Sequence, residues 1–255
     1  MSIAFCNRIA IKAEPMFRLG LHRRPHILGR LDMTDTQTLA PTDFAAARRH
    51  MIESQLRPTD VSDPVVIGAM AVTPRENFVP PSHRALAYID RAIAIGGGRV
   101  LNPALSTGLL LTRAELAGDD KVLLIGSGTG YAAALLAGIV SHVVAVEEDR
   151  TLVEQSKVHL DALGNVTLVE SALAQGHAAG APYDLIIIDG AVEQVPEEIV
   201  AQLGDGGRLL TGLDESGVTR LASGRRQAGA FALVPFADTD IAPLAAFARP
   251  KRYTF

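Results

Sequence analysis

Apolar residues at helical spacing mark the first ordered part of the chain. From Asp43 onward they recur on one side, with charged residues opposite, as in an amphipathic helix: Phe44, Ala47, Met51, Ile52 and Leu56. A second apolar stretch, "DPVVIGAMAV", begins with Asp63 and Pro64, which suit a helix cap and first turn, and it ends before Pro74. Two short helices are therefore expected ahead of the main sheet.

Beyond Lys121 short apolar runs alternate with longer helical stretches, which is typical of a parallel sheet with crossover helices. The runs predict strands in "KVLLIG", "HVVAVE", "NVTLVE", "DLIIID" and "RLLTG". Helices are expected in "YAAALLAGIV", "DRTLVEQSKVHLDALG" and "VPEEIVAQLG", and a closing pair of strands around "FALVPFAD". The predicted fold class is α/β: a Rossmann-like, doubly wound, mostly parallel sheet with helices on both faces and an N-terminal helical extension.

The segment "AIGGGRVLNP" interrupts these patterns with three consecutive glycines and a proline. Such a composition predicts a loop or a bulged edge that lies close to another part of the molecule, and not a regular element. This segment is a candidate site loop.

The first 32 residues are rich in arginine, poor in acidic residues and without the apolar core of a secretory signal. We expect residues 1–42 to be a disordered extension or the product of an over-long translation start, with an organelle transit peptide as the alternative. Residues 43–255 then form one domain with a helical cap, because 255 residues that are 48% hydrophobic suffice for one substantial core.

Composition excludes several classes of partner. A net charge of -4 gives no concentrated basic surface for nucleic acid. The longest apolar runs have the length of strands, so no membrane span is expected. The single cysteine, Cys6, cannot form an intrachain disulfide, which fits a reducing compartment and a cytoplasmic protein.

The glycine-rich stretch "VLLIGSGTGYAAAL" is the strongest local feature. A buried strand runs through five residues that we assign to cofactor binding, and then into a helix: Gly126, Ser127, Gly128, Thr129 and Gly130. Glycines permit a tight turn and close approach of a ligand, and free amides at a helix start attract an anion such as the methionine carboxylate of S-adenosylmethionine. A dinucleotide fingerprint would need a small residue where Tyr131 stands, so the spacing favours S-adenosylmethionine; a turn without a ligand is the alternative.

Three polar residues follow predicted strands and extend this candidate site. Glu147 ends the second strand, where a carboxylate can accept hydrogen bonds from two ribose hydroxyls. Ser171 follows the third strand, where an adenine contact is expected, and Asp189 ends the fourth, at the carboxyl edge where ligands of such folds gather. The alternatives are an exposed strand-end acid for Glu147 and turn residues for Ser171 and Asp189.

No other chemistry is indicated by the sequence. The seven histidines show no metal-ligand spacing backed by a carboxylate motif, so no metal is expected. No serine stands in a nucleophile elbow and the one cysteine lies near the N-terminus, so covalent catalysis has little support.

Several stretches, in order, are similar to protein-L-isoaspartate O-methyltransferases: "MIESQLRPTDVSDPVVIGAMAVTPRENFVPP", "LAYIDRAIAIGGGR", the glycine loop and "YDLIIIDGAVEQVPEEIVAQLGDGGRLL". The resemblance covers about residues 51–210, and its most specific parts are "PRENFVP" and "LAYIDR". It implies an enzyme that transfers the methyl group of S-adenosylmethionine to the carboxylate of an isoaspartyl residue in a protein or peptide, a step in protein repair. Because a carboxylate with a pKa of about 4 is already ionised at neutral pH, no general base is required.

The chain departs from the family pattern at three polar positions. The family's loop serine before the proline is missing, since the chain reads Arg99, Val100, Leu101, Asn102 and Pro103; Asn102 is our substrate-side candidate. The acidic residue before the glycine loop is replaced by Leu124, and an aspartate near the third strand end by Ser171. Two further interpretations therefore stay open: a methyltransferase of the same fold with another substrate, and a non-catalytic descendant that acts as a binding protein. The oligomeric state is not indicated.

Overall fold

The computed structural model describes residues 43–249 of the chain. The predicted N-terminal extension, residues 1–42, and the last six residues lie outside the described part. Residues 43–249 belong to one compact unit of the chain.

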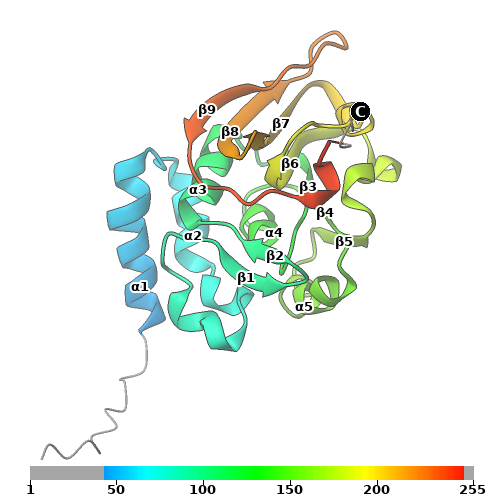
Figure 1. The fold of residues 1–255 in the computed structure, drawn as a ribbon. Coiled ribbons are helices and arrows are strands. Elements are labelled where there is room, and N and C mark those ends of the chain that lie inside the picture. The colour runs from blue at the N-terminus through cyan, green and yellow to red at the C-terminus, as the bar shows by residue number, and fades with distance from the viewer. Residues whose placement is uncertain (1–42, 250–255) are drawn as a thin grey trace, which may run out of the picture. The chain divides into compact units, whose positions relative to one another are not determined.

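A seven-stranded sheet forms the centre of this unit, with the strand order β5-β4-β3-β6-β7-β8-β9 (Figure 1). The strands from β5 to β7 are parallel, and β8 runs antiparallel to both of its neighbours. This confirms the predicted mostly parallel sheet. The strand bounds are β3 Lys121–Ile125, β4 His142–Glu147, β5 Val166–Glu170, β6 Tyr183–Val192, β7 Leu203–Glu215, β8 Val218–Arg225 and β9 Val234–Asp238.

Both faces of the sheet are covered, which explains why its central strands are apolar throughout. Successive side chains of β3, such as Val122 and Leu123, belong to two separate apolar clusters, one on each face. The first face is covered by α2 (Pro64–Val72), α3 (Ala104–Arg113), α4 (Tyr131–Ala137) and α5 (Arg150–Leu160). The second face has a thinner cover, made of the short helix α6 (Glu197–Val200) and 3-10 turns at Leu173–Gln175 and Ala245–Phe247.

The two predicted N-terminal helices are confirmed. The side chain of Asp43 accepts a hydrogen bond from the backbone N–H of Ala46 and so caps α1 (Phe44–Met51), which continues as a π-helical turn, Ile52–Leu56. Asp63 caps α2 in the same way, through the backbone N–H groups of Val65 and Val66.

The glycine segment forms a regular element, contrary to the sequence prediction. It folds as an antiparallel hairpin of β1 (Ile93–Gly96) and β2 (Arg99–Leu101), with the predicted irregularity present as a register shift between Ala94 and Gly96. Gly96, Gly97 and Gly98 all have positive φ, between 57° and 108°, a region that other residues rarely adopt. The glycines therefore make the turn of the hairpin.

Candidate active site

The carboxyl ends of four parallel strands bring the predicted site residues to one edge of the sheet. Ile125 of β3 is aligned with Val146 of β4 and with Ile188 of β6, and Glu147 is aligned with Glu170 of β5. The glycine loop follows β3, Glu147 is the last residue of β4, and Ser171 follows β5. Asp189 lies in β6, directly after Ile188. They therefore lie at the same edge, as the sequence predicts.

The glycine loop between β3 and α4 needs glycine for its backbone conformation. Gly126, Gly128 and Gly130 have φ values of 80°, 56° and 95°, all in the left-handed region. Close packing adds a second requirement, because a Cβ atom on Gly128 would lie 2.9 Å from Cδ1 of Ile95 in the hairpin. The absence of side chains at these positions lets other groups lie close to the loop backbone. In this structure one of these groups is Ile95 of the hairpin.

The two hydroxyl residues of the loop differ in their contacts. Thr129 is buried, and its Oγ1 donates a hydrogen bond of 2.6 Å to the carbonyl oxygen of Phe78. Ser127 is also buried, and within the described residues its Oγ has no hydrogen-bond partner. An unpartnered hydroxyl in such a position is free to bind a ligand group.

Glu147 is buried completely and accepts hydrogen bonds at both carboxylate oxygens. The backbone N–H of Gly128 donates to Oε2 at 2.7 Å, and those of Glu148 and Asp149 donate to Oε1 at 3.0 and 3.2 Å. The alternative interpretation, an exposed strand-end acid, is therefore wrong. These three donors hold the carboxylate at the junction between β4 and the glycine loop.

Arg99 of β2 is the fourth partner of this carboxylate, and the sequence analysis did not assign it a role. Its Nη1 lies 2.9 Å from Oε1 and 3.1 Å from Oε2 of Glu147. Its Nη2 donates to the carbonyl oxygen of Gly126 at 3.0 Å. Arg99 thus links the hairpin to both the glycine loop and β4. The only sequence signal was a basic residue directly after three glycines.

Asn102 and Asp189 form a second pair at the same edge. Nδ2 of Asn102 donates to Oδ1 of Asp189 at 2.9 Å and to its carbonyl oxygen at 3.1 Å. Oδ1 of Asn102 accepts from the backbone N–H of Ala242 at 3.0 Å. Burial raises the pKa of the Asp189 carboxyl above its ordinary value, and the hydrogen bond from Asn102 acts in the opposite direction.

A cavity of about 230 Å³ lies beside this pair. Asn102 and Asp189 line it together with Arg99, so polar groups of the hairpin and of β6 face the same space. Backbone and apolar groups complete the lining: Gly98, Val100, Ala242, Pro243 and Leu244. The arrangement can bind a small polar group between an amide, a carboxyl and a guanidinium.

Arg75 holds the backbone of Asn102 in place. The sequence does not predict this role. Arg75 is fully buried, its Nε donates to the carbonyl oxygen of Ala87 at 2.8 Å, and its Nη2 donates to that of Asn102 at 2.5 Å. The guanidinium lies over the ring of Tyr131, 4.8 Å from its centre. Burial lowers the pKa of Arg75. The buried cation therefore fixes the backbone of the residue that contacts Asp189.

Ser171 lies at the end of β5, where the sequence places it. Its backbone N–H donates to the carbonyl oxygen of Glu147 at 3.1 Å, and the residue is partly exposed. Its position beside Glu147 agrees with a contact to the same ligand.

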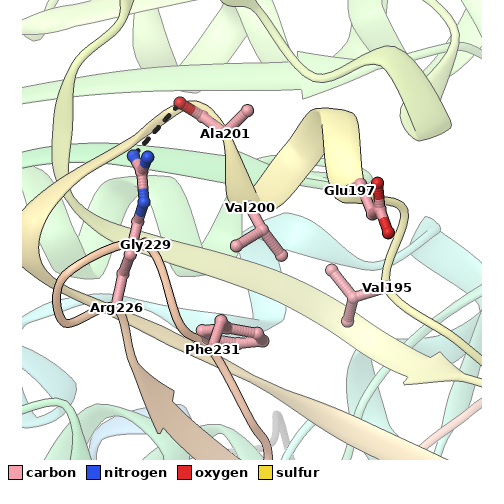
Figure 2. A pocket seen from close by; sticks show the side chains of 7 residues that line it. All are labelled: Val195, Glu197, Val200, Ala201, Arg226, Gly229 and Phe231. Atoms are coloured by element: carbon pink, nitrogen blue, oxygen red, sulfur yellow. Dashed lines mark hydrogen bonds between the residues drawn. The ribbon is translucent and has the colours of Figure 1, made fainter.

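A further cavity, of about 550 Å³, lies between α6 and the loop that joins β8 to β9 (Figure 2). None of the predicted site residues lines it; those that do are Val195, Glu197, Val200, Ala201, Arg226, Gly229 and Phe231. Within residues 43–249, no helix is long and apolar enough to cross a membrane, and no group of three or more His, Cys, Asp or Glu residues could hold a metal ion.

The residue types at the edge match an S-adenosylmethionine site, but side chains of the protein itself cover the groups that would contact this cofactor. Arg99 engages both oxygens of Glu147, the carboxylate that the sequence assigns to the ribose hydroxyls. The glycine loop is covered by Ile95 and Leu244, whose side chains lie within 3.4 Å of the Cβ positions of Gly128 and Gly126. The cofactor would therefore require a different position of these side chains.

Comparisons with known proteins agree with this architecture. A model of the protein-L-isoaspartate(D-aspartate) O-methyltransferase family matches residues 46–244. The protein-L-isoaspartate O-methyltransferase of Koribacter versatilis is 34% identical over 205 residues, which are 80% of this chain and 92% of that protein.

Two solved structures are similar as well. One, described as a protein-L-isoaspartate O-methyltransferase, has a TM-score of 0.68 and 26% identity, over 78% of this chain and 66% of its own. The other, described as a beta-aspartate methyltransferase of Plasmodium falciparum in complex with S-adenosyl-L-homocysteine, has a TM-score of 0.68 over 81% of this chain and 100% of its own; at 18% identity it shows the shared fold. Given the family match over residues 46–244 and the relative covered almost completely, the chain belongs to the protein-L-isoaspartate O-methyltransferase family.

Proposed function

We propose that this chain is an S-adenosylmethionine-dependent methyltransferase that methylates the carboxylate of isoaspartyl residues in proteins. The observation that carries the proposal is family membership across residues 46–244, which include every residue of the candidate site. The glycine loop supports it, because its three positive-φ glycines and the buried Glu147 keep the features that a nucleoside-containing cofactor needs.

Cofactor contacts are assigned to the residues of the glycine loop and of the next strand ends. Ser127 would offer a free hydroxyl, and Glu147 a carboxylate once Arg99 has moved away. Ser171 and Asp189 flank the same edge. The complete set is Gly126, Ser127, Gly128, Thr129, Gly130, Glu147, Ser171 and Asp189.

The acceptor side is assigned to Asn102 and the cavity next to it. An isoaspartyl carboxylate is ionised at neutral pH, so it needs orientation and not deprotonation. Asn102 and Arg99 bring side-chain hydrogen-bond donors to the lining of this cavity. In this structure both N–H groups of the Asn102 amide are donated to Asp189, so one of them would have to turn toward the substrate carboxylate for Asn102 to orient it. In this proposal Asn102 does the work of the serine expected from the family resemblance.

The proposed partners are proteins or peptides that carry isoaspartyl residues, in the cytoplasm. Nucleic acids and membranes are not proposed as partners, in keeping with the net charge of -4 and with the helices of the described residues.

The proposal is tested by methyl transfer from labelled S-adenosylmethionine to a pair of peptides that differ only in one isoaspartyl or aspartyl linkage. The full chain should label the isoaspartyl peptide at least tenfold faster than its aspartyl counterpart. A Glu147→Ala variant should label it much more slowly. Equal labelling of both peptides would assign the activity to a different acceptor. Labelling of neither peptide, while the protein binds the cofactor, would contradict the proposal.

A further inference from the structure

We propose that Arg99 sets the cofactor affinity of this protein by competing, from within the chain, for the carboxylate of Glu147. In the structure Arg99 occupies that carboxylate, and S-adenosylmethionine binds only to molecules in which the hairpin β1–β2 has withdrawn it. This inference rests on the proposed function, because it concerns access to the same cofactor site.

Arg99 contacts both the carboxylate of Glu147 and the glycine loop, the two parts of the proposed cofactor site. One nitrogen of its guanidinium engages the two oxygens of Glu147, at 2.9 and 3.1 Å, and another contacts the carbonyl oxygen of Gly126 at 3.0 Å. The side chain of Glu147 is 0% exposed and that of Arg99 only 14%. No ribose hydroxyl can reach this carboxylate until the guanidinium leaves.

The rest of the hairpin closes the same space. Ile95 of β1 covers Gly128, and the hairpin turn at Gly97 packs so closely on Asp149, the residue that caps α5, that a Cβ atom on Gly97 would collide with its carboxylate. Arg99, Ile95 and the turn belong to one element, so a single displacement of the hairpin would open the site. Three glycines with positive φ at the turn give that element backbone freedom.

Glu147 does not depend on Arg99 for its position. The backbone N–H groups of Gly128, Glu148 and Asp149 all donate to its carboxylate, so these hydrogen bonds keep it oriented when the guanidinium is absent. Removal of Arg99 is therefore expected to expose a site that is already assembled.

The affinity for S-adenosylmethionine is expected to depend on the fraction of molecules in the open form, in which Arg99 has left Glu147. A ligand that binds only the open form has an apparent Kd equal to its intrinsic Kd divided by the fraction of molecules that are open. The buried ion pair between Arg99 and Glu147, with the further hydrogen bond from Arg99 to Gly126, favours the closed form. A variant without Arg99 should consequently bind S-adenosylmethionine at least tenfold more tightly than the unaltered protein.

The test is calorimetric titration of the full chain with S-adenosylmethionine and S-adenosylhomocysteine, as the unaltered protein and as an Arg99→Ala variant. Arg91→Ala is the matched control, since Arg91 is exposed and stands just before the same hairpin. We expect at least a tenfold fall in Kd for Arg99→Ala and no change for Arg91→Ala. Arg99→Met, which keeps an apolar stem to pack in the site, replaces the alanine variant if that variant does not fold, and the same fall is expected.

The outcomes separate this inference from the proposed function. If the unaltered protein binds the cofactor and the folded Arg99 variants bind it equally well or more weakly, the proposed competition is overturned. The methyltransferase proposal then stays in place. Absence of binding by the unaltered protein and by both folded variants would overturn the inference and the proposed function together.

Discussion

Asn102 connects three segments of the chain through one amide group. It donates to Asp189 in β6 and accepts from the backbone N–H of Ala242 in the segment after β9, while Arg75 donates to its backbone carbonyl oxygen. A serine at this position has one hydroxyl and a shorter reach, so it cannot make the same set of contacts. The asparagine therefore has a structural role in addition to the proposed contact with substrate.

Substitution of Asn102 tests both roles. Asn102→Ala leaves the Asp189 carboxyl and the Ala242 N–H without their partner, and we expect it to lower the free energy of unfolding by about 1–3 kcal/mol. Methyl transfer to an isoaspartyl peptide should fall more than cofactor binding does. Denaturant titration and a comparison of kcat and KM measure the two effects, with Asn102→Ser as the conservative control. Unchanged stability together with unchanged activity would show that the amide has neither role.

Asp189 gives a prediction about pH. Because burial raises its pKa in the folded protein, the folded state holds the proton more tightly than the unfolded chain does. The protonated Asp189 carboxyl therefore contributes its full stability below a pH of about 4, its pKa in the unfolded chain. This contribution is lost as the pH rises through the higher pKa of the folded protein. We expect Asp189→Asn to increase the Tm by a few degrees at pH 7, and this gain to vanish near pH 3.5. A lower Tm at pH 7 would show that the ionised carboxylate is stabilised in the fold.

The sequence predicts site residues that stand at the carboxyl ends of strands. It does not predict side chains from other segments that contact these residues. The strand rule places Glu147 and Asp189 at the carboxyl edge because each directly follows a buried apolar run. It says nothing about Arg99, which meets Glu147 across 48 residues of sequence. The position of such a side chain depends on how the hairpin packs, which no local pattern specifies.

The segment after β9 packs against the last residues of β6, at the carboxyl edge of the sheet. The backbone N–H of Ala191 donates to the carbonyl oxygen of Ala242 at 2.7 Å, and that of Leu244 donates to the carbonyl oxygen of Ala191 at 2.8 Å. Leu244 packs so closely on Gly190 that a Cβ atom there would collide with it. The segment is thereby fixed against β6, next to Asp189.

A double-mutant cycle tests this packing. Gly190→Ala should destabilise the protein by about 1–3 kcal/mol because its methyl group overpacks the contact with Leu244. Leu244→Ala removes buried apolar volume and should destabilise as well. The double variant should be more stable than the sum of the two effects implies, by at least 0.5 kcal/mol, since the shorter side chain makes room for the methyl group. Simple additivity in denaturant titrations would mean that the two side chains do not share this contact.

Element prediction from the sequence succeeds where the pattern is continuous and fails where packing decides. The runs in β3, β4 and β5 are found almost to the residue. Strands β6 and β7 extend beyond the predicted runs, because their pairing with neighbours continues past the apolar core. Helix α3, in "ALSTGLLLTR", is not anticipated, and the segment "AIGGGRVLNP" forms a hairpin because its two halves pair across the glycine turn.

At the scale of the whole molecule, residues 46–244 match the family model. They contain both the residues proposed to bind the cofactor and the hairpin β1–β2, whose Arg99 contacts Glu147. Cofactor binding should therefore couple to stability, because a ligand that binds only the folded protein stabilises it by about 2.7 kcal/mol at a concentration of 100 times its Kd.

This coupling gives a prediction that thermal unfolding can check. At one fixed concentration of S-adenosylmethionine, the rise in Tm should be larger for Arg99→Ala than for the unaltered protein, because the variant binds more tightly. Arg91→Ala should show the same rise as the unaltered protein. A smaller rise for Arg99→Ala would mean that the guanidinium assists binding of the cofactor.

The most direct test of the central claim is the initial rate of methyl transfer to the isoaspartyl peptide, measured over a range of S-adenosylmethionine concentrations for the unaltered protein and for Arg99→Ala. The account predicts transfer by both, strong preference over the aspartyl peptide, and a lower KM for the cofactor in the variant. No transfer to the isoaspartyl peptide by either folded protein at saturating cofactor would contradict it.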